Sequence, residues 1–253
     1  MKKILLILLS FTIFAVNSFA ESESLSKGVE LYNDSEYSQA KPYFEKIVRL
    51  KNEEVGEAYY YLAEIAYFTL AEPKNDVEHE RLLRLSIAKD YIPAITHLGG
   101  YISDAKEGEK ILLAGLEKFP NDESIIEGLT DVYYGMGATD KTVNFYEQLG
   151  AKGNNKAYLN LGYLYQDDEQ YNLAEENYLK AANNNVEGSK LALAEFYKSQ
   201  KKYDLAEKYY FEVKAEDSVD GLAELYITQK KYDLVEKLFQ DSGTYDYFIE
   251  EIL

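Results

Sequence analysis

The sequence contains no cysteine and no tryptophan, and only two histidines and four prolines among 253 residues. The missing cysteine excludes disulfides, thiolate metal sites, cysteine nucleophiles and a lipid-modified cysteine. Basic residues are also few. The chain has 27 Lys and Arg but 45 Asp and Glu, which gives a formal net charge of -18. This balance argues against a nucleic-acid surface, which needs clustered Lys and Arg. Apolar residues (46%) and 25 tyrosines are abundant, so the chain can bury a core.

The first twenty residues have the pattern of a secretory signal peptide. Two lysines precede an apolar run over residues 4–16, and small Ser18 and Ala20 come before a polar stretch. The run is shorter than the roughly 20 apolar residues of a membrane span. We therefore predict a signal peptide over residues 1–20, cleaved before Glu21, and export to the periplasm or out of the cell. Its removal changes the net charge from -18 to -20. A retained N-terminal anchor is the alternative.

Internal repeats indicate the architecture of the remaining chain. The segment 201–208, KKYDLAEK, returns at 230–237 as KKYDLVEK. Three copies align in register, because equivalent positions carry the same kind of residue. These are Leu161, Gly162, Tyr165, Tyr171, Ala174, Tyr178 and Ala181, then Leu193, Ala194, Tyr197, Tyr203, Ala206, Tyr210 and Val213, then Leu222, Ala223, Tyr226, Tyr232, Val235 and Phe239.

Each copy predicts a pair of antiparallel helices. A small residue on the first helix allows the second helix to approach closely, while large rings fill the space between pairs. Asp204 with Glu207 and Asn172 with Glu175 have the spacing of a capping box, which predicts the starts of two second helices. The same spacing recurs at Asp233 and Glu236, and no strand alternation competes with this interpretation.

These residues resemble the tetratricopeptide repeat family, whose repeats span about 34 residues. Their variable length is also similar to Sel-like repeats, and the residues fit both families. The resemblance implies an all-α solenoid (superhelix) of about seven antiparallel helix pairs over residues 21–253, with a short cap at 244–253. Gly135, Gly137, Gly150 and Gly153 loosen the pattern, so we expect the weakest point of the stack at the third to fourth pair. Weaker copies precede the three above at Gly28 to Ile47, Leu62 to Pro93, Leu98 to Pro120 and Thr130 to Leu149.

No catalytic, cofactor-binding or metal-binding residue is predicted. His79 and His97 have no metal-ligand spacing, and no phosphate loop, calcium loop or nucleophile elbow is present. Some secreted Sel-like proteins carry penicillin-binding or β-lactamase labels, but those relatives resemble disulfide-stapled repeats and this chain has no cysteine. We predict a non-catalytic scaffold that binds a protein or peptide, no nucleic acid and no membrane. An enzyme acting on cell-wall material or polysaccharide and a module that self-associates through its end repeats are the alternatives.

The resemblance implies that the first helices of the repeats line a concave surface. The residues that fall there are acidic and aromatic, so we expect a basic or Lys-rich extended segment as partner. The alternative is that these carboxylates only keep the protein soluble. Tyr59, Tyr60 and Tyr61 are consecutive, so at least one of them must face a neighbouring repeat. The candidate partner-binding residues are Glu57, Tyr60, Glu64, Tyr67, Phe68, Glu127, Asp131, Tyr134, Tyr163, Asp167, Glu195, Lys198, Asp220 and Glu224.

Overall fold

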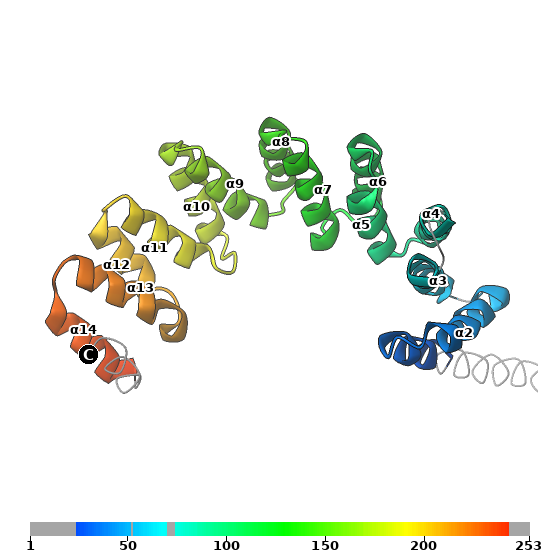
Figure 1. Ribbon diagram of the computed structural model, residues 1–253. Coiled ribbons are helices and arrows are strands. Elements are labelled where there is room, and N and C mark those ends of the chain that lie inside the picture. Colours follow the sequence, from blue (N-terminus) through cyan, green and yellow to red (C-terminus); the bar gives the residue numbers. More distant parts are fainter. Residues whose placement is uncertain (1–23, 52, 70–73, 243–253) are drawn as a thin grey trace, which may run out of the picture. The chain divides into compact units, whose positions relative to one another are not determined.

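The computed structural model describes residues 24–51, 53–69 and 74–242, which are drawn in colour in Figure 1. The predicted signal peptide and the predicted cap lie outside these residues. Over the described ranges the regular elements are helices, and none is a strand. None of the helices in the described part of the chain has the length and apolar character needed to cross a membrane.

The helices follow one another along the chain and pack in consecutive pairs, as Figure 1 shows. The predicted fold class, an all-α solenoid of antiparallel helix pairs, is confirmed. After a helix at residues 24–33, the elements are α2 (Tyr37–Leu50), α3 (Val55–Thr69), α4 (Lys74–Ile87), α5 (Ile92–Tyr101), α6 (Ala105–Lys118), α7 (Glu123–Gly135), α8 (Thr139–Ala151), α9 (Lys156–Asp167), α10 (Tyr171–Asn183), α11 (Ser189–Ser199), α12 (Tyr203–Tyr210), α13 (Ala215–Thr228) and α14 (Tyr232–Ser242).

The chain forms two compact units, of which the first ends at Ala138 and the second begins at Thr139. The first compact unit contains the helices up to α7, and the second contains α8 to α14. The boundary directly follows Gly137, whose φ of 64° places it in the left-handed region. It therefore falls within the glycine-containing region, the third to fourth pair, where the sequence analysis expects the weakest point of the stack. Helices α7 and α8, the predicted fourth pair, lie on opposite sides of it.

The first compact unit is built around buried apolar residues of α2 to α5. Phe44, Ile47, Leu83 and Leu98 are fully buried in one cluster. The hydroxyl of Ser86 near the end of α4 donates a hydrogen bond of 2.6 Å to a backbone carbonyl near the start of α3. This contact joins opposite ends of the two helices, as antiparallel packing requires.

The second compact unit has a core of alternating small and aromatic residues. Tyr178 and Tyr210 are fully buried, and so are Ala174 and Ala206, which the repeat pattern places where paired helices approach closely. Gly162 on α9 lies so near the ring of Tyr178 that an added Cβ would be 2.5 Å from two ring carbons. The close approach predicted at the small positions is therefore present.

The capping-box prediction is wrong for two second helices. Helices α10 and α12 begin at Tyr171 and Tyr203, two residues before the expected starts at Leu173 and Leu205, and the residues before them make no side-chain capping hydrogen bond. In the turn between α11 and α12, the backbone caps the end of α11. The N–H of Lys202 donates to the carbonyl of Tyr197, five residues earlier, and Lys201 adopts the left-handed conformation with φ 58°. This backbone pattern satisfies the helix end without a side chain.

We expect Lys201→Gly to raise the free energy of unfolding by about 0.5 kcal/mol. A side chain in the left-handed region costs about 1–2 kcal/mol, and the greater freedom of glycine in the unfolded chain offsets about 0.5–1 kcal/mol of the relief. Urea unfolding followed by circular dichroism measures the change. The matched control is Lys237→Gly in the exposed interior of α14, which is expected to destabilise by about 1 kcal/mol. Equal destabilisation by both changes would contradict the prediction.

Candidate functional site

All the candidate partner-binding residues lie on α3, α7, α9, α11 and α13, the first helices of their pairs. On α3 they differ in exposure. Tyr67 and Phe68 are exposed, with 38% and 54% of their surface accessible, whereas Glu57, Tyr60 and Glu64 are half-buried. Burial, followed by repulsion from Glu54, raises the pKa of Glu57 above its usual value. The α3 residues therefore do not form one uniformly open acidic surface.

Helix α7 carries an exposed stripe of two carboxylates and a ring. Glu127, Asp131 and Tyr134 are all exposed and lie about one turn apart along the helix. Neither Glu127 nor Asp131 forms an ion pair with a residue in the described ranges. Both charges are therefore available to a ligand on this face of the first compact unit.

In the second compact unit, three of the candidate residues pair with one another. The ammonium group of Lys198 lies 2.7 Å from a carboxylate oxygen of Glu195 on α11 and 2.7 Å from one of Glu224 on α13. Burial disfavours the charged ammonium, but the hydrogen bonds to both carboxylates outweigh it and raise the pKa of Lys198. These ion pairs connect α11 to α13, so the charges of the three residues are only partly available to a partner.

The other three candidates in this unit lie beside the pairs. The ring of Tyr163 is 47% exposed and meets the buried ring of Tyr178 edge-on, with centroids 5.4 Å apart. Asp167 on α9 and Asp220 on α13 are exposed and have no ion pair within the residues that the structure describes. These two carboxylates and the Tyr163 ring are the parts of this surface that a partner can contact.

A hydrogen bond that repeats along the second compact unit was not predicted from the sequence. A tyrosine on each first helix donates its hydroxyl to a glutamate on the preceding second helix. Burial, followed by the neighbouring carboxylate, raises the pKa of each of these tyrosines. The pairs are Tyr165 with Glu147 at 3.2 Å, Tyr197 with Glu175 at 2.9 Å and Tyr226 with Glu207 at 2.6 Å.

Two of these glutamates, Glu175 and Glu207, are the ones that the sequence suggested as capping-box residues. Glu175 also forms an ion pair of 2.8 Å with Lys202. The carboxylates therefore connect successive repeats rather than stabilising the start of their own helices. Part of the large negative charge of the chain holds the stack together and is not free for a partner.

The structure also brings together two histidines that the sequence analysis set aside. His79 on α4 and His97 on α5 both face Glu64 on α3, and one carboxylate oxygen of Glu64 lies 3.1 Å from Nε2 of His79 and 3.2 Å from Nδ1 of His97. We call these three residues and the adjacent Tyr60, Tyr67 and Tyr101 the histidine cluster. The packing of α3, α4 and α5 creates it, and no local sequence motif indicates it.

Electrostatics holds the carboxylate of this cluster in its charged form. Burial on its own raises the pKa of Glu64, but the hydrogen bonds and charges of His79 and His97 outweigh burial and lower the pKa to about 2. Burial, followed by the Glu64 charge, raises the pKa of Tyr60 to about 12. The arrangement is thus one buried anionic oxygen faced by two imidazole nitrogens.

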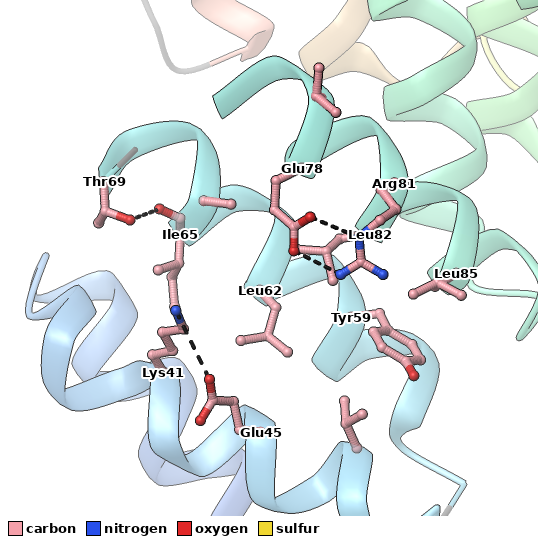
Figure 2. A pocket seen from close by; sticks show the side chains of 13 residues that line it. Lys41, Glu45, Tyr59, Leu62, Ile65, Thr69, Glu78, Arg81, Leu82 and Leu85 are labelled. Carbon is pink, nitrogen blue, oxygen red and sulfur yellow. Dashed lines mark hydrogen bonds and ion pairs between the residues drawn. The ribbon is translucent and has the colours of Figure 1, made fainter. Parts of the chain in front are cut away.

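The remaining face of α3 lines a pocket of about 750 Å³ between α2 and α4, shown in Figure 2. Leu62, Leu82 and Leu85 belong to its apolar lining. Charged pairs stand at its rim, Lys41 with Glu45 at 4.0 Å and Arg81 with Glu78 at 2.7 Å.

The three consecutive tyrosines of α3 face different surroundings. Tyr59 lines the pocket between α2 and α4, whereas Tyr60 lies in the histidine cluster. Tyr61 stacks on Phe44 of the neighbouring repeat, with centroids 4.9 Å apart. The expectation that at least one of the three packs against a neighbouring repeat is confirmed.

The tetratricopeptide repeat family model matches residues 156–185. This range contains α9, the turn after it and α10. This pair is a tetratricopeptide repeat. No curated protein sequence matches the chain. Stacked repeats of this type are scaffolds that typically bind other proteins through extended surfaces, and the fold is generally not enzymatic.

Several solved structures are similar to the chain at low sequence identity. PilF of Pseudomonas aeruginosa is 17% identical with a TM-score of 0.48, and the match covers 92% of this chain and 98% of PilF. A protective antigen of uropathogenic Escherichia coli with an SLR fold is 17% identical with a TM-score of 0.46. That match covers 92% of this chain but only 56% of the antigen, so the chain spans little more than half of its length. A tetratricopeptide repeat protein of Parabacteroides merdae is 17% identical with a TM-score of 0.41, covering 89% and 79% of the two chains.

Proposed function

We propose that the protein is a non-catalytic, exported scaffold that binds a basic segment of a protein or peptide along the first helices of its repeats. The observation that carries this proposal is the stripe on α7, where Glu127 and Asp131 are exposed beside the ring of Tyr134. The tetratricopeptide repeat over residues 156–185 supports the scaffold part of the proposal. The signal-peptide pattern of residues 1–20 supports export.

The chemistry of the stripe favours a basic partner over an acidic one. Two carboxylates about one helical turn apart attract a lysine or arginine and repel a carboxylate. The neighbouring ring of Tyr134 offers an apolar surface for the stem of such a side chain and a π-face for its charge. In the second compact unit, Asp167 and Tyr163 repeat this combination of an exposed carboxylate and an exposed ring on α9. Each compact unit therefore carries an exposed carboxylate and an exposed ring that can contact a basic side chain.

We expect the double change Glu127→Lys and Asp131→Lys to weaken binding of a basic peptide at least about tenfold, because it replaces two attractive charges by two repulsive ones. The probe is a fluorescently labelled oligolysine titrated with residues 21–253, with anisotropy as the measurement. Binding of the unaltered protein should weaken as salt rises, because exposed charges are screened over about 8 Å at physiological ionic strength.

The matched control is the double change Glu117→Lys and Glu187→Lys. These two glutamates are exposed and lie at the end of α6 and in the loop before α11, away from the candidate face. The control alters the net charge of the protein by the same amount, so it reports non-specific attraction. Equal loss of binding in the two variants would show that the peptide responds to overall charge and would contradict the proposed surface.

A further inference from the structure

The geometry of the histidine cluster matches that of a metal site. One nitrogen of His79, one nitrogen of His97 and a carboxylate oxygen of Glu64 all lie within 4.8 Å of one another. The carboxylate oxygen is 3.1 Å and 3.2 Å from the two nitrogens. An ion with ligands at about 2.0–2.2 Å in tetrahedral arrangement separates its ligand atoms by roughly 3.3 Å. The two oxygen–nitrogen distances match this separation, and the two nitrogens lie within 4.8 Å of each other, so the three atoms can converge on one ion after rearrangement of the side chains.

The residues around the three ligand atoms hold the imidazoles in place. The ring of His79 lies 5.2 Å from that of Tyr67 and 5.3 Å from that of Tyr101, and the ring of His97 lies 5.9 Å from that of Tyr60. His79 is almost fully buried, whereas 26% of the His97 side chain is exposed. The site is thus supported from three helices and reachable from solvent on the His97 side.

The two ring nitrogens of His79 have different surroundings. Nε2 lies 3.1 Å from the carboxylate of Glu64, whereas Nδ1 is buried and has no hydrogen-bond partner among the described residues. Burying a polar atom without a partner costs roughly 1–3 kcal/mol, and an ion at Nε2 would leave that cost in place. Nε2 is therefore the atom that His79 offers to an ion.

We propose that Glu64, His79 and His97 bind a divalent first-row transition-metal ion of the Zn²⁺ type. Two imidazole nitrogens and one carboxylate oxygen are a ligand set that such ions accept, and they favour these ions over Ca²⁺ or Mg²⁺, which take oxygen ligands. Water completes the coordination on the open side beside His97. The ion would join α3, α4 and α5 and so stabilise the first compact unit around the pair that carries Tyr67 and Phe68.

The test is a titration of chelator-treated protein, residues 21–253, with ZnCl₂ in competition with a chromophoric chelator. We expect one Zn²⁺ per chain and a rise in melting temperature on binding, because an ion that binds only the folded chain stabilises it. His97→Gln and Glu64→Gln each remove one ligand and are expected to weaken binding by more than about 100-fold. Asp76→Asn is the matched control: Asp76 accepts a hydrogen bond from Tyr101 but supplies no ligand, and affinity should be unchanged.

A second measurement does not depend on whether the variants fold. The chain has two histidines in all, so nitrogen-detected NMR of the unaltered protein resolves both imidazoles. Both imidazole signals should shift together and saturate at one equivalent of Zn²⁺. Unchanged imidazole signals at one equivalent, or full binding retained in both His97→Gln and Glu64→Gln, would overturn the proposal.

Discussion

Replacing Tyr178 by alanine is expected to lower the free energy of unfolding of the second compact unit by about 3–5 kcal/mol, the cost typical of removing a large buried aromatic ring. The ring is fully buried on α10 between Gly162 and Phe196, whose ring centroid lies 5.4 Å away. Its hydroxyl also donates a hydrogen bond of 3.0 Å to Gln166. Because α9 of the same repeat and α11 of the next repeat both pack against this ring, the helices cannot close the cavity without losing other contacts.

Urea unfolding of the wild type and two control variants separates the contributions. Tyr178→Phe keeps the ring and loses the hydrogen bond to Gln166, so it should cost about 1 kcal/mol. Tyr171→Ala removes a ring from the same helix that is 40% exposed, and it should cost clearly less than Tyr178→Ala. Since a domain of this kind has about 5–15 kcal/mol of stability in total, Tyr178→Ala removes a large share of it. A cost no greater than that of Tyr171→Ala would contradict the packing described above.

The positions of the repeats were predictable from the sequence because they depend on residue size and spacing. Residues similar in size to Gly162, Ala174 and Tyr178 recur at equivalent positions along the chain. A pair of antiparallel helices can bury these positions in only one arrangement. The fourth pair was less visible from the sequence, since Gly135 and Gly137 weaken the pattern where the two compact units meet. Size and spacing thus identified the helices, whereas the division into two units required the structure.

The predicted starts of α10 and α12 were wrong by two residues because two interactions compete for the same glutamate. Glu207 has the spacing of a capping residue relative to Asp204, and this signal is local. In the structure it accepts a hydrogen bond from Tyr226, which lies on the next helix. A sequence pattern within one repeat carries no information on a partner in the following repeat, so the local interpretation was the natural one.

The histidine cluster could not be predicted for the same physical reason. Glu64, His79 and His97 meet because of the rotation of α4 and α5 about their axes relative to α3, and a rotation by one residue would separate them. The acidic face was predicted only in part. Lys198, Glu195 and Glu224 neutralise one another across α11 and α13, so charges that look available in the sequence are internally paired. The exposure of each carboxylate and its ion pairs within the protein, rather than its residue type, decide whether a partner can contact it.

Gly162→Ala is expected to lower the free energy of unfolding by about 1–3 kcal/mol, although the same change in an open helix normally raises it by about 1 kcal/mol. The reason is that the new Cβ would lie 2.5 Å from ring carbons of Tyr178, and this buried ring has no space to move. Gly100→Ala on α5 is the control, because a Cβ there meets no atom within 4 Å, and we expect it to stabilise.

The decisive measurement combines Gly162→Ala with Tyr178→Ala in a double-mutant cycle. In the Tyr178→Ala background the ring that opposes the new Cβ is gone, so only the helix preference of alanine remains and Gly162→Ala should become stabilising. The change of sign corresponds to a coupling of about 2–4 kcal/mol, which is large because the residues are in direct contact. If Gly162→Ala has the same effect in both backgrounds, Gly162 is not the position at which Tyr178 limits the approach of α9 and α10.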